Sequence, residues 1–370
     1  MAGRWHRLYS GETTINFYGR RNIGFFASGL LLVVTIGSLI FQGLNLGIDF
    51  TGGVAYELPA KGQLNVAAAE KILDDNEVDS SNAKILSLSS GSDQRLRIQF
   101  GEVEPAVETA IKEDLAKKAS VDLQEVSVEK VSATWGRNIT WDAIRALAVF
   151  LLLVSLFIAW RFESRMAIGS LVAVVHDVVI SVGVYSVLQL EVTPSTVVSF
   201  LTILGFSLYD TIVVFDKVQE NVTRFSGSRV SYGDIVNVSM NQVLMRSLNT
   251  TISAVLPVLS LLLLGSGVFG AVALQEFALA LLVGMAVGAY SSIYIATPVL
   301  GLLRERSAEY VTKRGELSLG KDMATLMATG APVSRRASAR NTDATPDVPP
   351  LPAVEAILSH PPRPRKKSRR

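Results

Sequence analysis

The sequence predicts a multi-pass α-helical membrane protein with six transmembrane helices and a small α+β extracytoplasmic domain between the first and second helix. Hydrophobic residues make up 49% of the 370 residues, and the mean hydropathy is +0.35. The apolar residues form blocks of the length that a membrane-spanning helix needs, about 20 residues. One long polar segment, Leu44–Thr140, separates the first block from the others.

The first apolar block is predicted to be a retained transmembrane helix. It is too long and too far from the N-terminus for a signal peptide, and no small-x-small cleavage site follows it. The predicted transmembrane helices are Ile23–Gly43, Trp141–Trp160, Met166–Leu188, Pro194–Phe215, Leu248–Leu264 and Phe277–Leu300.

These blocks divide the chain into parts. We expect a cytoplasmic N-terminus (1–22), a first helix (23–43), an extracytoplasmic domain (44–140), a bundle of the other helices (141–304) and a cytoplasmic tail (305–370). The tail is rich in Pro, Ala, Ser and Arg and is predicted to be disordered from about residue 331. Its basic end could lie near anionic lipid or the ribosome, or be a solvated segment that reinforces the orientation. No other nucleic-acid partner is expected.

The basic residues of the short loops predict the orientation, because Lys and Arg stay on the cytoplasmic side. The connections Gln189–Thr193 and Gly265–Glu276 contain neither Lys nor Arg. The other loops and the flanking segments carry Arg4, Arg7, Arg20, Arg21, Arg161, Arg165, Lys217, Arg224, Arg229, Arg304 and Arg306. The alternation predicts that both termini are cytoplasmic.

The extracytoplasmic segment has the pattern of a small α+β domain. Runs of alternating apolar residues bounded by turn residues are typical of strands. The predicted strands are Gly53–Leu58, Ala83–Ser89, Gln94–Phe100 and Leu123–Ala133, and the predicted helices are Val66–Asn76 and Glu104–Ala119. This βαββαβ order suggests a ferredoxin-like sandwich, a fold that hosts many functions and therefore indicates none.

Two glycine-rich motifs resemble nucleotide-binding sequences without their context. Gly315–Asp322 is close to a Walker A loop but has Asp322 where that loop needs Ser or Thr, and no strand precedes it. Gly265–Gly270 matches a dinucleotide fingerprint but lies between two apolar blocks. The chain also has no cysteine, which excludes disulfides and thiolate chemistry. We therefore expect neither an enzyme nor a bound cofactor or metal.

Polar side chains interrupt three of the apolar blocks. Asp177 lies eleven residues from either end of the third block, with His176 beside it, and Asp210 lies in the fourth. An ionised group at mid-membrane costs about 2.5–3.5 kcal/mol on insertion scales, so it usually has a function. Helical spacing places Ser170 and Ser181 on the face of Asp177, and Thr196, Ser199 and Ser207 on the face of Asp210. A third polar stripe comprises Arg246, Asn249, Thr250 and Ser253. We expect the three stripes to point at one another.

A proton path is the function that these groups favour. Burial favours the protonated form of a carboxyl group and a nearby arginine favours the ionised form. Asp210 beside a movable Arg246 could therefore take up and release a proton. The alternative is that these residues, Asp177 included, only join helices through interhelical hydrogen bonds. His176 fits a hydrogen-bond partner better than a proton carrier.

Small residues recur at every fourth position of the sixth block. Gly284 and Gly288 lie in this ridge with Ala280, Ser292 and Ala296. Such a ridge lets another helix approach closely, and the helix could belong to a sister subunit.

Several of these segments resemble the motifs of the SecD/SecF protein-export family. They are Asn45–Gly53 (NLGIDFTGG), Gly205–Asn221 (GFSLYDTIVVFDKVQEN), His176–Val178 (HDV) and Arg246–Thr251 (RSLNTT). The resemblance covers about residues 15–305. One departure is Tyr209, where many family members have Asn; its phenol can still donate a hydrogen bond.

The resemblance implies a membrane subunit of the RND-like superfamily in a bacterial plasma membrane. Such a subunit pairs with a SecD-like sister subunit, associates with the SecYEG channel, and uses proton-motive force to help export unfolded polypeptide after the SecA ATPase has acted. The matched positions comprise the proton-relay residues Asp210, Arg246 and Asp177; their supporting polar residues His176, Ser207, Tyr209, Asn249 and Thr250; and the ectodomain-base motif Asp49, Thr51, Gly52 and Gly53.

Two other classes of function remain open at this point. An RND-type exporter of small molecules or lipids usually has two six-helix halves in one chain, whereas this chain has one. A non-transporting scaffold of the translocon would need the small-residue ridge but not the carboxyl group of Asp210.

Overall fold

The computed structural model describes residues 13–90, 93–226, 228–267, 272–313 and 315–330. Within these residues, six helices are long and apolar enough to cross a membrane, and they form the body of the protein. They are α2 (Arg21–Phe41), α6 (Ala133–Arg161), α7 (Ser164–Leu188), α8 (Pro194–Arg224), α9 (Tyr232–Gly267) and α10 (Val272–Ser291), which continues through a π-helical turn, η3 (Ser292–Ala296), into α11 (Thr297–Glu305). The predicted number of membrane helices is confirmed. The prediction of disorder from about residue 331 lies outside the described residues.

Two helices are longer than predicted at the end of the bundle remote from the sheet. α8 continues to Arg224, and α9 begins sixteen residues before Leu248. The added part of α9 carries buried Asn237 and Asn241, so its hydropathy is too low for an apolar block. These amides hold the chain before α2, since Asn241 exchanges two hydrogen bonds of 2.8 Å with the backbone of Ile15.

The sheet domain follows α2 in the chain and precedes α6. It has strands β1 (Gly53–Pro59), β2 (Lys84–Ser90), β3 (Asp93–Phe100) and β4 (Ser127–Val131), with helices α4 (Val66–Asp75) and α5 (Pro105–Ala119). The sheet is antiparallel with strand order β2-β3-β1-β4. The predicted order of elements is confirmed, but the last strand is shorter than predicted. Ala133 already belongs to α6, whose N-cap Ser132 accepts a hydrogen bond from the Trp135 amide.

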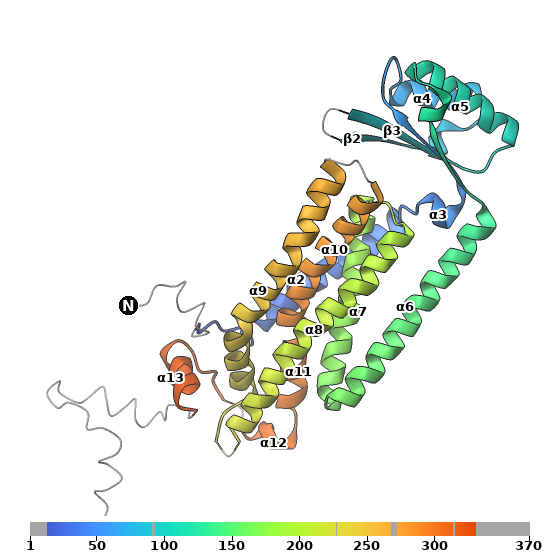
Figure 1. Ribbon diagram of the computed structural model, residues 1–370. Coiled ribbons are helices and arrows are strands. Elements are labelled where there is room, and N and C mark those ends of the chain that lie inside the picture. The colour runs from blue at the N-terminus through green and yellow to red at the C-terminus, as the bar shows by residue number, and fades with distance from the viewer. Residues whose placement is uncertain (1–12, 91–92, 227, 268–271, 314, 331–370) are drawn as a thin grey trace, which may run out of the picture.

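One face of the sheet is covered by the two helices and the other lies toward the membrane bundle (Figure 1). Alternate β1 residues, such as Tyr56 and Leu58, pack with Leu73 of α4 and Leu115 of α5 in the domain core. The opposite face carries polar residues of β2 and β3 that bond to Leu46, just before the short helix α3 (Ile48–Thr51), and to the loop between α7 and α8.

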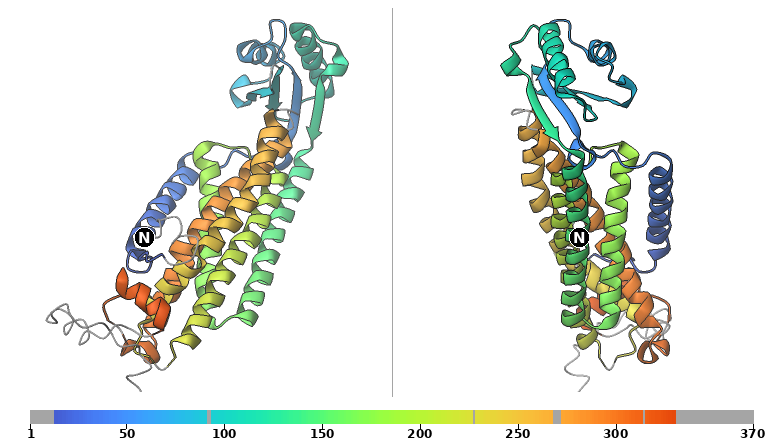
Figure 2. Two further views of the ribbon diagram at one scale, coloured as in Figure 1. Left: turned by 60° about the vertical axis from the view of Figure 1, so that its left-hand side comes forward. Right: turned by 90° about the vertical axis from the view of Figure 1, so that its right-hand side faces the viewer.

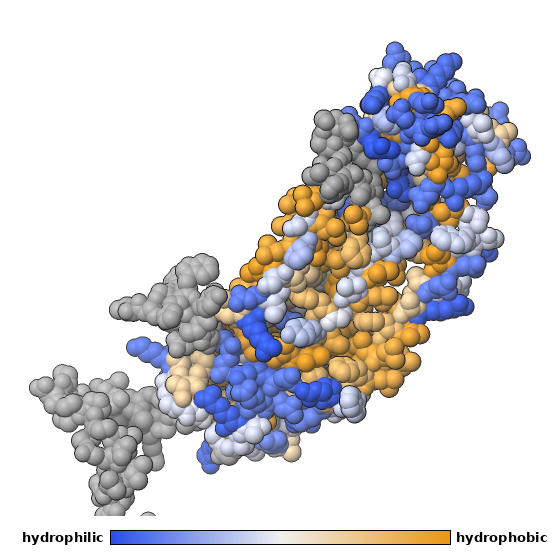
Figure 3. Space-filling model, in the orientation of Figure 1, coloured by the Kyte–Doolittle hydropathy of each residue, from blue (hydrophilic) through white to orange (hydrophobic). Residues whose placement is uncertain are grey.

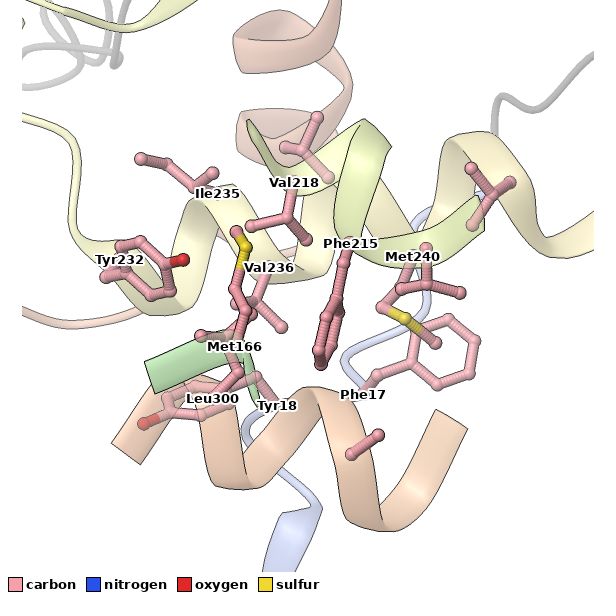
Figure 4. Packing of buried hydrophobic residues seen from close by; sticks show 14 of the residues in the cluster. Phe17, Tyr18, Met166, Phe215, Val218, Tyr232, Ile235, Val236, Met240 and Leu300 are labelled. Carbon is pink, nitrogen blue, oxygen red and sulfur yellow. The ribbon is translucent and has the colours of Figure 1, made fainter. Parts of the chain in front are cut away.

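The other end of the bundle holds the largest apolar core (Figure 4). Tyr18 from the segment before α2 packs there with Phe215 of α8, Tyr232 of α9 and Leu300 of α11. Residues beyond the family resemblance also join it, because α12 (Ala308–Val311) and α13 (Lys321–Thr329) fold back against this end. The views in Figure 2 place α13 and the sheet domain at opposite ends of the bundle.

The surface of the helices divides into a hydrophobic belt with hydrophilic regions at both ends (Figure 3). A band of hydrophilic side chains crosses the belt on the face shown. An apolar belt of this kind fits a bilayer, so the protein is a membrane protein.

Candidate functional site

Asp177 forms the first polar centre of the bundle, at the middle of α7. Its side chain is 1% exposed. Oδ2 accepts hydrogen bonds from Ser207 of α8 at 2.5 Å and from Ser291 of α10 at 2.8 Å. Oδ1 lies 3.1 Å from Nδ1 of His176. Both oxygens of this carboxyl group are therefore engaged, and the group joins three helices.

Gly288 and Gly284 of α10 make this junction possible. A Cβ on Gly288 would lie 2.8 Å from Cβ of Ser207, and one on Gly284 would overlap Ile203 of α8. The predicted ridge of small residues is thus filled by α8 of the same chain. The suggestion that a sister subunit occupies it is wrong, because Ala280, Ser292 and Ala296 are also fully buried within the chain.

Asp210 forms the second polar centre, on the same face of α8 as Ser207. Its side chain is 2% exposed, and Oδ1 accepts a hydrogen bond of 2.6 Å from Ser247 of α9. Oδ2 is buried and has no hydrogen-bond partner among the described residues. A buried polar atom without a partner costs about 1–3 kcal/mol, so Oδ2 is the position at which a proton, a water molecule or a cation would act.

The π-helical turn lies beside both centres. Ser292 Oγ is 3.0 Å from Thr211 Oγ1, next to Asp210 in α8, and it reaches the backbone oxygen of Ser207 at 3.4 Å. Thr297 donates to the backbone oxygen of Ser292 at 2.7 Å. π-helical turns are rare and often occur at functional sites. Ser291, the residue before the turn, donates to Asp177 of α7, whereas Ser292, its first residue, contacts α8.

The polar stripe predicted on α9 does not face the two centres. Arg246, Asn249 and Ser253 are exposed on the outside of the bundle, and Thr250 is half-buried and bonded to backbone oxygens of its own helix. Within the described chain, no ion pair includes Arg246. Ser247 contacts Asp210 instead, because successive residues of a helix point in directions about 100° apart. Tyr209 is also on the outside, 49% exposed.

The predicted stripe of α8 is buried along its length but is interrupted. Thr196 and Ser199 lie at the sheet-domain end with Thr193, whose Oγ1 donates to Glu276 of α10 at 3.1 Å. Between this group and Ser207 lies an apolar layer formed by Ile203, Leu281 and Met285. The polar centres are thus separated from the sheet-domain end in this conformation.

The ectodomain-base motif forms a joint between the sheet domain and the bundle. Gly52 and Gly53 have φ of +78° and +138°, and a Cβ on Gly52 would lie 2.7 Å from Cα of Ala133 at the start of α6. Leu46 pairs with Val192, just before α8, through backbone hydrogen bonds from Gly47 and to Asn45. Thr51 Oγ1 bonds to the backbone of its own turn.

Side chains of the sheet reinforce the joint. Lys84 Nζ donates to the backbone oxygen of Leu46 at 2.6 Å, and Gln99 Nε2 donates to Oε1 of Glu191 at 2.9 Å. Asp49 lies in the same region and is half-buried. Its burial, and then the charge of Glu129, raise the pKa of its carboxyl group.

Asp177, Asp210, His176 and Ser207 lie in a buried polar region, as expected, but their partners Ser247, Ser291 and Ser292 were not predicted. Serine is common in membrane helices, so single serines give little signal. The adjacent pair Ser291–Ser292, in an otherwise apolar block, was the one available indication.

Fold and site together define a multi-pass membrane protein with the buried carboxyl groups of Asp177 and Asp210 in the middle of its helices, the architecture of a transport protein. The chain matches the family model "Protein export membrane protein SecD/SecF, C-terminal" over residues 111–306 and the model "SecD/SecF GG Motif" over residues 37–63. It is 41% identical to protein translocase subunit SecF of Streptomyces coelicolor, over 81% of this chain and 79% of that relative. It is 40% identical to SecF of Mycobacterium tuberculosis, over 81% and 70%.

A solved structure has the same fold. The crystal structure of SecDF from Thermus thermophilus, described as a translocon-associated membrane protein, aligns with a TM-score of 0.71 at 32% identity, over 80% of this chain and 39% of that chain. The chain belongs to the SecD/SecF family of protein-export membrane proteins.

Proposed function

We propose that this chain is a subunit of the Sec protein translocase that pairs with a SecD-like subunit and uses proton-motive force to promote export of unfolded polypeptide. It would lie in a bacterial plasma membrane, with the sheet domain outside the cell and both termini in the cytoplasm. The SecF name of the relatives supports the translocase role, and the alternation of basic loops supports the orientation. The strand order β2-β3-β1-β4 supports a ferredoxin-like plan for the sheet domain.

The observation that carries the proton hypothesis is the unpartnered Oδ2 of Asp210. Asp177 is saturated by three hydrogen bonds and is better suited to holding helices together. Asp210 Oδ1 accepts a hydrogen bond from Ser247, and Oδ2, in the interior of the bundle, has no hydrogen-bond partner among the described residues. A group of this kind can change its protonation state without breaking a complete set of bonds.

α8 offers a mechanical link from this carboxyl group to the sheet domain. Asp210 lies sixteen residues beyond Pro194, roughly 24 Å along a helix that rises 1.5 Å per residue. Thr193 precedes this helix and follows Val192. Val192 pairs with Leu46, which lies just before the ectodomain-base motif. A shift of α8 on proton uptake would thus reach the joint beneath the sheet domain.

The outer face of α8 and α9 is the proposed surface for the SecD-like partner. It carries Gly205 and Tyr209 of α8 and Arg246 and Asn249 of α9, all exposed. Arg246 borders the apolar stretch of α9 and has no ion pair among the described residues, so we propose that a polar group of the partner faces it. The fusion of SecD and SecF in the relative from Thermus thermophilus supports a partner of this kind. By analogy with the family, the subunit would also contact the SecYEG channel and act after SecA.

Export of a preprotein under a proton gradient tests the proposal, with SecA ATP hydrolysis stopped after initiation. Asp210→Asn is expected to abolish the stimulation by the gradient, because the side chain can no longer exchange a proton. Asp142→Asn, the same change at an exposed acid of α6, is the matched control. Full stimulation of export in Asp210→Asn would refute the proton path.

The two rival functions give different results in related experiments. A small-molecule or lipid exporter would not copurify with a SecD-like subunit and SecY, whereas the proposed subunit should. A non-transporting scaffold would tolerate Asp210→Asn but lose function in Gly284→Leu and Gly288→Leu, where the new side chains would force α8 and α10 apart.

A further inference from the structure

An apolar groove lies between α2 and α7, and the one ionisable residue among the described residues that line it is His176, whose Nδ1 contacts Asp177. Its volume is about 570 Å³, within the range of about 300–1,000 Å³ of small-molecule sites. α2 lies along α7 at the edge of the bundle (Figure 2). The walls include Phe25, Gly29 and Leu32 of α2, Val172 and Val175 of α7, and Val299 of α11. Water does not fill a space with so apolar a lining, so its occupant is hydrophobic.

Three arginines continue the walls of this groove at the end remote from the sheet domain. Arg21 precedes Phe25 by one turn of α2, and Arg165 precedes Val172 by two turns of α7. Arg306 follows Val299 by two turns and keeps helical geometry, with φ of −81°. Residues at these spacings lie on one face of a helix.

These cations have no acidic partner among the described residues, since none of the ion pairs there includes them. Arg21 is oriented by Tyr18, because Nη1 donates to the Tyr18 backbone oxygen at 3.0 Å and the guanidinium lies 4.4 Å from the ring centre. Arg165 has a buried Nη1 without a hydrogen-bond partner. A positively charged guanidinium with an unsatisfied buried nitrogen indicates a missing anionic acceptor.

We propose that the groove binds one anionic phospholipid of the adjacent leaflet, with an acyl chain between α2 and α7 and its phosphate at Arg165 and Arg306. The hydrocarbon wall fits the chain, and a planar guanidinium matches the geometry of a phosphate. Basic pockets between membrane helices bind anionic headgroups in this way. Basic residues that only orient a membrane protein need not lie near a groove. These arginines lie on the same helix faces as the groove residues, which favours lipid binding. The inference does not depend on the proton path.

Native mass spectrometry of the full chain tests the proposal. The protein is released from nanodiscs that contain equal amounts of phosphatidylglycerol and phosphatidylcholine, and the phospholipids that remain bound are counted. We expect one retained phosphatidylglycerol per chain. Arg165→Gln and Arg306→Gln should each reduce its retention roughly fivefold, the factor that corresponds to about 1 kcal/mol per basic residue. Arg229→Gln, an exposed arginine of the α8–α9 loop, is the matched control.

The groove itself is tested by filling it. Gly29 and Gly37 both lie on α2, and a Cβ added at either would have no atom within 4 Å, so the two positions accept a side chain equally well. Gly29→Leu should remove the bound phospholipid, whereas Gly37→Leu, outside the groove, should not. Equal effects of the two variants would mean that the counted lipid is only annular, and equal retention of the two phospholipids would exclude recognition of charge. Either result overturns the proposal.

A helix of another protein could also occupy the groove, and crosslinking distinguishes it from a phospholipid. Because the chain has no cysteine, Val172→Cys can carry a benzophenone label as its single thiol adduct in native membranes. A phospholipid adduct after illumination supports the proposal, and an adduct with another polypeptide overturns it.

Discussion

Ser247 Oγ donates a 2.6 Å hydrogen bond to Asp210 Oδ1, whereas its neighbour Arg246 is exposed on the outside of α9. One helix thus gives a hydroxyl group to the buried carboxyl group and a cation to the outer surface of the chain. The arrangement separates two roles, holding Asp210 in place and facing a partner.

The role of Ser247 can be tested by stability. Ser247→Ala removes the 2.6 Å hydrogen bond to Asp210 Oδ1 and should lower the free energy of unfolding by roughly 0.5–2 kcal/mol, the range for such bonds within membranes. The measurement is an unfolding titration with sodium dodecyl sulfate in mixed micelles. Ser253→Ala, on the exposed face of the same helix, should leave the free energy unchanged. Equal losses in the two variants would show that Ser247 does not stabilise the site.

Arg246 should matter for assembly and not for folding of the isolated chain. Arg246→Gln removes an exposed charge that no ion pair of the described residues compensates, so the isolated variant should be at least as stable as the parent. Its copurification with a SecD-like subunit should fall several-fold. A variant that is less stable in isolation but still binds the partner fully would contradict the proposed surface.

Gly53 should be sensitive to the smallest side chain. Its φ of +138° is unfavourable for alanine, and the added Cβ would overlap the backbone oxygen of Phe100. Strain of this kind costs on the order of 1–3 kcal/mol. Gly53→Ala should therefore increase the rate of limited proteolysis in the sheet domain. Gly101→Ala, where the added atom meets open space, is the control.

Asp49 should make the folded protein less stable as the pH rises. Its pKa is raised from 3.8 by burial, so the folded state holds the proton more tightly than the unfolded state. Stability is then lost as the pH rises from about 3.8 through the folded-state pKa. Asp49→Asn should raise the thermal unfolding temperature of the full chain at pH 7 and have a smaller effect near pH 4. A larger effect at the lower pH would reverse this assignment.

The order of the elements could be predicted because its signals are local. Each apolar block is long enough to reveal a membrane helix on its own, and Gly52–Gly53 marks the entry into β1. α13 could not be predicted from such a signal, since it is short and only Met323 and Leu326 are buried against the bundle. The early start of α9 was missed because Asn237 and Asn241 look like loop residues until Ile15 and Tyr18 are placed beside them.

By itself, the sequence determined the number of membrane helices, the position of the sheet domain between the first two, and the presence of two carboxyl groups in apolar surroundings. Only the tertiary structure decided which polar groups meet these carboxyl groups. Hydropathy and spacing depend on residues along one helix, whereas the pairing of Asp210 with Ser247 depends on how α8 and α9 are rotated about their axes. The π-helical turn adds a local change of register at Ser292, and helical spacing alone cannot reveal it.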